Sequence, residues 1–114
     1  MPTPWAFREL ARFPELRDGR VGRASEVADH FLAGNVAAGV EGWFNSLEAP
    51  VLEKYPVLAL HQDKLRSCGA IGARMSGSGS TTFALFATPS DAQVAAAAFR
   101  SEFGSAGWLH VAAL

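Results

Sequence analysis

The residues best suited to chemistry in this 114-residue chain form a loop of serine and glycine that ends in threonine: Ser76, Gly77, Ser78, Gly79, Ser80 and Thr81. Glycine adopts positive φ at no steric cost, and such a loop exposes main-chain N–H groups and hydroxyls. These groups can surround an anion or allow another backbone to approach closely. The bland alternative is a tight turn that binds nothing, because glycine is the usual turn residue.

The residues after the loop decide which kind of glycine loop it is. A dinucleotide-binding turn or a P-loop opens a helix, whereas residues 82–86 are β-branched and aromatic and indicate a strand. Thr82 stands where the third glycine of a dinucleotide motif would be, and no lysine follows the glycines, which excludes both classes. The pattern predicts a hairpin of two strands, residues 70–75 and 82–87, joined by the loop.

The other side chains that could do chemistry are scattered. His30, His61 and His110 are far apart, and neither cysteine nor carboxylate stands at metal-ligand spacing from them, so we expect no metal site. Cys68 has no flanking Lys or His and is predicted to be an inert, buried thiol. The simplest interpretation of Trp43 and Trp108 is that both are core aromatics.

The loop and its strands resemble the third conserved motif of the GHMP kinases, the superfamily of galactokinase, homoserine kinase and mevalonate kinase. Three further segments resemble one branch, the 4-diphosphocytidyl-2-C-methyl-D-erythritol kinases: residues 1–7, residues 45–48 and the pair Tyr55-Pro56. The resemblance extends from about Pro2 to Val111. It departs from the family at Ser46, where the branch usually has Asp.

The resemblance implies two sites in this chain. Residues Ser76 to Thr81 would brace the ATP-phosphate loop close to the reacting phosphate. Thr3, Pro4 and Phe7 would line the pocket for a cytidine-diphosphate sugar alcohol, although the same residues also suit a capped helix start with buried aromatics. For Asn45 and Glu48 we favour local capping and helix–helix contact over a ligand.

The resemblance also implies that the chain, residues 1–114, is the carboxy-terminal domain of a longer kinase. The family's amino-terminal half carries the main ATP loop and the catalytic Lys and Asp, so we expect no catalytic residue here and no activity of this chain alone. ATP and Mg²⁺ would be bound mainly by that half, which would be the domain's partner. Two alternatives stay open: a free-standing binding or dimerisation module, and the carboxy-terminal domain of another GHMP kinase.

The resemblance implies an α+β fold, a ferredoxin-like sandwich with an antiparallel sheet and about five helices packed on it. Three strands are expected, the hairpin and residues 108–112, with a fourth lying before Met1. The unpaired edge left by that strand could pair with a second copy of the chain. Hydrophobic spacing and cap residues predict a surface loop over 14–24 and helices over residues 3–13, 25–33, 36–47, 51–55, 57–68 and 89–103.

Composition limits the remaining classes. The net charge is −1 and the 10 Lys and Arg residues are spread along the chain, which argues against nucleic acid as a partner. The apolar stretches are too short to span a bilayer, and the first residues do not have the pattern of a signal peptide. With a single cysteine, these features lead us to expect a soluble cytoplasmic protein.

Overall fold

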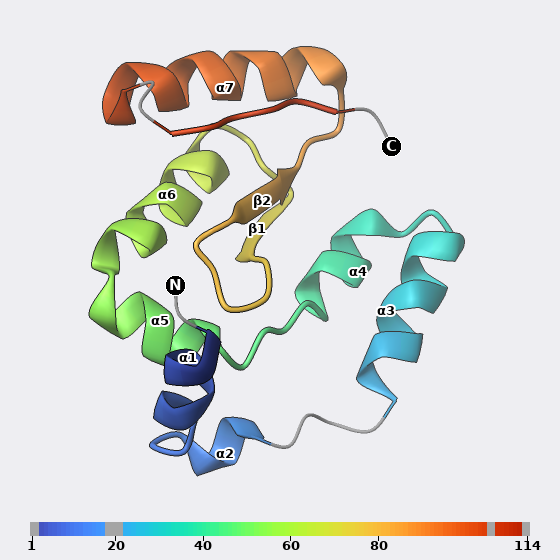
Figure 1. Ribbon diagram of the computed structural model, residues 1–114. Helices are drawn as coiled ribbons and strands as arrows, with labels where there is room; N and C mark the ends of the chain where they lie inside the picture. Colours follow the sequence, from blue (N-terminus) through green and yellow to red (C-terminus); the bar gives the residue numbers. More distant parts are fainter. Residues whose placement is uncertain (1–2, 18–21, 105–106, 113–114) are drawn as a thin grey trace.

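A computed structural model describes residues 3–17, 22–104 and 107–112 of the chain. Helices and a single hairpin make up this part of the chain, so the predicted α+β class is confirmed (Figure 1). The elements, in chain order, are α1 (Thr3–Leu10), α2 (Pro14–Arg17), α3 (Arg23–Leu32), α4 (Val36–Glu41), α5 (Glu48–Lys54), α6 (Pro56–Ser67), β1 (Gly72–Met75), β2 (Thr82–Leu85) and α7 (Pro89–Phe103).

The predicted hairpin is confirmed. β1 and β2 are antiparallel, with Gly72 opposite Leu85 and Met75 opposite Thr82. The main-chain N–H of Ser76 donates to the carbonyl of Thr81 over 2.8 Å, which continues the pairing to the base of the glycine loop. The loop therefore connects two strands whose register is fixed.

The predicted third strand is wrong. Residues 108–112 form no strand, and the described part of the chain contains a two-stranded sheet. A strand needs a neighbouring strand for its main-chain groups, and in the described part of the chain neither β1 nor β2 pairs with residues 108–112. Trp108 is not a core aromatic either, because it is 86% exposed and its ring stacks on His110 with centroids 5.8 Å apart.

Several helix predictions need correction; for example, α5 begins at Glu48 and not at residue 51. The expected loop over 14–24 contains α2, and α3 begins at Arg23. The expected helix over 36–47 ends at Glu41, because Gly42 caps it with its N–H directed to the carbonyls of Gly39 and Val40. The amphipathic spacing continued past this point, but glycine is a poor helix former.

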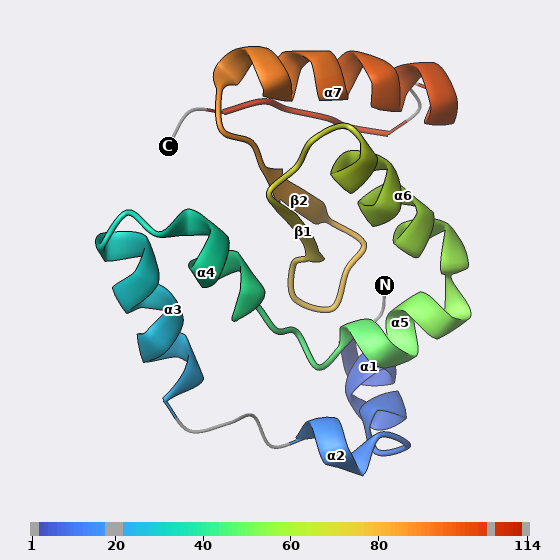
Figure 2. The same cartoon turned by 180° about the vertical axis from the view of Figure 1, so that it is seen from behind.

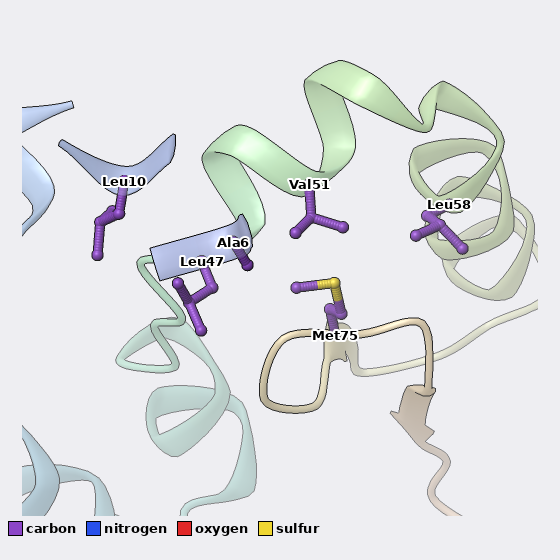
Figure 3. Packing of buried hydrophobic residues seen from close by; sticks show 6 residues of the cluster. All are labelled: Ala6, Leu10, Leu47, Val51, Leu58 and Met75. Carbon is purple, nitrogen blue, oxygen red and sulfur yellow. The ribbon is translucent and has the colours of Figure 1, made fainter. Parts of the chain in front are cut away.

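The hydrophobic core lies where α1, α5 and α6 meet the end of β1. Figure 3 shows the side chain of Met75 directed towards Val51, with the other members of the cluster around them. Trp5, Phe13, Leu52 and Tyr55 pack against this cluster and are partly buried. The buried members are Ala6, Leu10, Leu47, Val51, Leu58 and Met75. Because Met75 immediately precedes the glycine loop, the core fixes one end of that loop.

Helices α3 and α4 pack on each other and form a pair set apart from α1 and α2 (Figure 2). A Cβ atom at Gly39 would lie 2.8 Å from the ring of Phe31, and one at Gly42 would lie 2.6 Å from Val27 Cγ2. These glycines therefore permit a close helix–helix approach. The pair reaches the hairpin through Trp43, whose ring meets that of Phe83 at 5.1 Å between centroids.

Helix α7 joins α6 through an aromatic contact that includes a histidine. The ring of His61 lies 4.5 Å from that of Phe103 and 5.0 Å from that of Phe99, and Lys64 pairs with Glu102 over 2.8 Å beside them. Burial in this contact lowers the pKa of His61 below its usual value, because a charged imidazole loses hydration there.

This shift predicts a pH-dependent stability. The unfolded chain binds a proton at His61 near pH ~6.5, and the folded chain binds it only at lower pH. Stability should therefore fall as the pH drops through this window, and we expect the midpoint of thermal unfolding to be lower at about pH 5.5 than at about pH 7.5. The variant His61→Phe should weaken this dependence. Equal pH dependence of the two proteins would contradict the assignment to His61.

No helix within the described ranges is long and apolar enough to cross a membrane.

Candidate functional site

The glycine loop between β1 and β2 is exposed over most of its length. Gly77 has φ +59° and Gly79 has φ +86°, values that favour glycine over residues with a side chain. The N–H of Gly79 donates to the carbonyl of Ser76 over 3.1 Å, which closes a tight turn within the loop. Ser76, Ser80 and Thr81 lie at the surface, and Ser78 is half-buried. The predicted loop residues therefore form one compact, glycine-dependent turn.

Thr3 places the first predicted substrate segment beside this loop. The hydroxyls of Thr3 and Ser78 are 2.9 Å apart, so one donates a hydrogen bond to the other. Thr3 lies in the first turn of α1, and Pro4 follows it on the surface. The structure thus joins two predicted sites that are 75 residues apart in the sequence.

Phe7 does not have the buried position that a helix start with buried aromatics would give it. Its side chain is 58% exposed, whereas Ala6 beside it is fully buried. An exposed aromatic ring one turn along α1 from Thr3 offers an apolar surface on the same helix. Thr3, Pro4 and Phe7 remain predicted substrate residues.

Asn45, in the connection between α4 and α5, also bonds to the glycine loop and to the residue before it. Its Nδ2 group donates to the carbonyl of Met75 over 2.9 Å and to that of Gly77 over 2.8 Å. Its Oδ1 atom accepts from the N–H of Leu47 over 3.1 Å. A local side-chain bond of the kind expected from the sequence is present, although it does not cap α5, and the two loop contacts were missed. The signal available was that residues 45–48 and the loop belong to the same family resemblance.

A buried polar network lies behind the loop and ties α5, α6 and β1 together. Gln62 donates to Glu48 Oε2 over 2.8 Å, and Arg74 Nε lies 3.7 Å from Glu48 Oε1. Arg66 donates to Gln62 Oε1 over 3.1 Å and to the carbonyl of Ala73 over 2.9 Å. Gln62 and Glu48 are buried and partnered, so these two side chains support the hairpin, whereas Arg66 and Arg74 are partly exposed.

The two outer edges of the hairpin differ. Bonded and non-bonded pairs alternate in an antiparallel ladder, so the carbonyls of Ala73 and Met75 point away from β2. Arg66 and Asn45 occupy these two carbonyls. Within the described residues, no side chain donates to the main chain of Thr82 or Ala84 on the outer edge of β2.

The site has donors for an anion and no evident catalyst. The loop offers main-chain N–H groups and hydroxyls, which suit phosphate oxygens. It contains no carboxylate, imidazole or amine that could act as a general base. In residues 3–17, 22–104 and 107–112, no three His, Cys, Asp or Glu side chains gather closely enough to hold a metal ion. These groups are of the kind that bind phosphate oxygens, and the loop itself has no side chain of the kind that activates a nucleophile.

Comparison with known proteins gives the family. A sequence profile described as "GHMP kinases C terminal" matches residues 32–105, which include Asn45, the hairpin and the glycine loop. The chain belongs to the GHMP kinase family. The matched range excludes Thr3, Pro4 and Phe7, so the predicted substrate segment of this GHMP kinase domain does not rest on the profile.

Curated relatives of this GHMP kinase domain are named 4-diphosphocytidyl-2-C-methyl-D-erythritol kinase. The protein of that name from Rhizobium etli is 47% identical over 102 residues, which cover 88% of this chain and 32% of the relative. Those from Syntrophotalea carbinolica and Cereibacter sphaeroides are 36% and 38% identical and cover 93% and 95% of the chain. The chain spans about a third of the length of these relatives. No solved structure matches it.

Proposed function

We propose that this GHMP kinase domain is the carboxy-terminal part of a 4-diphosphocytidyl-2-C-methyl-D-erythritol kinase. Such an enzyme moves the γ-phosphoryl group of ATP onto a hydroxyl of its sugar-alcohol substrate, in the cytoplasm, as a step of non-mevalonate isoprenoid biosynthesis. The observation that carries the proposal is the 47% identity to the Rhizobium etli kinase across 88% of the chain. The hydrogen bond between Thr3 and Ser78 supports it, because it brings the predicted substrate segment against the phosphate-bracing loop.

The proposed division of labour follows from the side chains present. Phosphoryl transfer depends mainly on positioning and on stabilising the charge of the transferred group. The N–H and hydroxyl groups of residues 76–81 fit phosphate oxygens, and Pro4 and Phe7 offer rigid apolar surface to the substrate. The described residues provide no cluster of carboxylates for Mg²⁺, so ATP and Mg²⁺ would be held mainly by the amino-terminal part of the enzyme. This chain alone would be inactive.

A chimera tests the proposal. The carboxy-terminal third of the Rhizobium etli kinase would be replaced by this chain, and the purified protein would be assayed with ATP, Mg²⁺ and 4-diphosphocytidyl-2-C-methylerythritol. We expect phosphorylation of the sugar alcohol at a kcat within about tenfold of the parent enzyme, since transition-state contacts on the amino-terminal part are unchanged. Neither the 114-residue chain nor the truncated relative should turn over ATP.

The controls separate the alternatives. A folded chimera that phosphorylates another GHMP kinase substrate and not this one would move the domain to a different branch. A folded but inactive chimera, with a 114-residue chain that unfolds cooperatively alone, would favour a free-standing module. If the chain does associate with itself, we propose that it does so through the β2 edge, because Arg66 and Asn45 already occupy the outer carbonyls of β1.

A further inference from the structure

We infer that Asn45 is a positioning residue for phosphoryl transfer, because its side-chain amide sets the conformation of the glycine loop that faces the phosphate. The inference rests on the proposed function for its chemistry. Its structural basis is independent of the substrate. It assigns to Asn45 a role beyond the local cap that the sequence suggested.

The hydrogen bonds of Asn45 leave its amide with a single orientation. The NH₂ group has two donors, and these go to the carbonyls of Met75 and Gly77, on either side of Ser76. The amide oxygen accepts from the N–H of Leu47. Turning the amide over would direct its oxygen at two carbonyl oxygens and its NH₂ group at an N–H. All three bonds would then be lost.

These bonds connect the glycine loop to the hydrophobic core through the amide group of Asn45. Met75 and Leu47 are both buried members of the hydrophobic cluster, while Gly77 is exposed at the start of the turn. Glycine has the largest backbone freedom to lose on ordering, so a loop containing Gly77 and Gly79 needs external bonds to hold one conformation. Asn45 fixes the first of these glycines, and the hydroxyl of Thr3 fixes Ser78 next to it.

A fixed loop matters more for this reaction than for simple binding. Hydrogen-bond donors stabilise the charge of a transferred phosphoryl group best when they already point at it, because reorienting them during the reaction would cost free energy. A displacement of about 1 Å at such a group can reduce the rate about a hundredfold. Asn45 would thus act through the loop without touching the substrate.

The chain offers a matched control for this residue. Asn35 is also an asparagine whose side-chain oxygen accepts from a main-chain N–H, that of Ala38 over 3.3 Å, at the start of α4. No bond from its side chain to the glycine loop occurs within the described residues. An Asp side chain keeps the accepting oxygen at either site and replaces the donating NH₂ group by a second oxygen.

The test compares Asn45→Asp with Asn35→Asp in the chimera described above. We expect Asn45→Asp to lower kcat about ten- to a hundredfold, with the KM for the sugar alcohol changed less than about twofold. Hydrogen exchange measured by mass spectrometry should become faster in the peptide that covers residues 75–82. Asn35→Asp should leave kcat, KM and the exchange of that peptide unchanged. Asn45→Ser, which keeps a smaller accepting group, serves if Asn45→Asp fails to fold.

The outcomes separate this inference from the proposed function. If the unmodified chimera is active and Asn45→Asp matches Asn35→Asp in kcat and loop exchange, Asn45 is only a local cap and the inference is wrong. If the folded chimera is inactive, the proposed function fails, and loop exchange in the 114-residue chain then decides. Faster exchange in Asn45→Asp alone would support the structural part of the inference, that Asn45 sets the loop conformation, and equal exchange in both variants would overturn it.

Discussion

Met75→Ala should lower the free energy of unfolding of this domain by about 2–5 kcal/mol. Met75 is 2% exposed and lies among Ala6, Leu47, Val51 and Leu58, which come from several helices and the connection before α5. Truncation removes buried apolar surface and leaves a cavity that the rigid helices around it fill only in part. Since domains of this size have a total stability of about 5–15 kcal/mol, the loss would be a large fraction of it.

Urea denaturation followed by circular dichroism measures this effect through the midpoint concentration and its slope. Leu60→Ala is a matched control, because Leu60 is a side chain of similar size on α6 that is 56% exposed. It should change stability by less than about 0.5 kcal/mol. Similar midpoints for the two variants would mean that Met75 is not at the centre of the core.

The parts of the fold that could be predicted are those fixed by local chemistry. The start of α7 followed from Thr88, Pro89 and Asp91, and the side chain of Thr88 indeed accepts from the N–H of Asp91 over 3.1 Å. Its end followed from Gly104, which has φ +79°. The hairpin followed from two short apolar runs around glycines. Each of these signals acts within a few residues and needs no distant partner.

The failed predictions concern segments whose state depends on distant neighbours. Residues 108–112 have the composition of a strand, but no neighbouring strand pairs with them in the described part of the chain. Trp43 and Phe44 continue the apolar spacing of α4, yet they follow its cap at Gly42, and the ring of Trp43 packs on Phe83 of the hairpin. The spacing of apolar residues predicts which side chains share a face, but it does not predict which other element packs against that face.

For the candidate site, too, the sequence predicted the local feature and missed the contacts with distant residues. The glycine loop was evident from composition, and its resemblance to a family motif gave it a predicted role. Its two long-range supports were not evident, because Thr3 and Asn45 are 75 and 32 residues from the loop residues that they bond. Thr3 was predicted to line the substrate pocket, and Asn45 was assigned to local capping, a role that short polar side chains commonly have. Only the fold shows that each also contacts the loop.

Gly72→Ala should destabilise the contact between α4 and the hairpin by about 1–3 kcal/mol. A Cβ atom at Gly72 would overlap Val40 Cγ1 and would also lie 3.4 Å from the ring of Trp43. Valine in a helix has one strongly preferred rotamer, so Val40 cannot turn away cheaply and α4 must move. Because α3 has no buried residue of its own, the α3–α4 pair should loosen as a unit. Hydrogen exchange should accelerate over residues 23–41 and stay slow over residues 48–58.

The double variant Gly72→Ala/Val40→Ala isolates the cause of this effect. Removing the methyl groups of Val40 makes room for the new Cβ, so the double variant should be more stable than Gly72→Ala alone, with a coupling of about 1 kcal/mol or more. Gly107→Ala is the control for the substitution itself, since a Cβ atom there meets open space. If the double variant is as unstable as the sum of its single changes, the overlap with Val40 is not what makes glycine necessary at position 72. The cost would then come from the strand backbone, and the α3–α4 pair would keep slow exchange in Gly72→Ala.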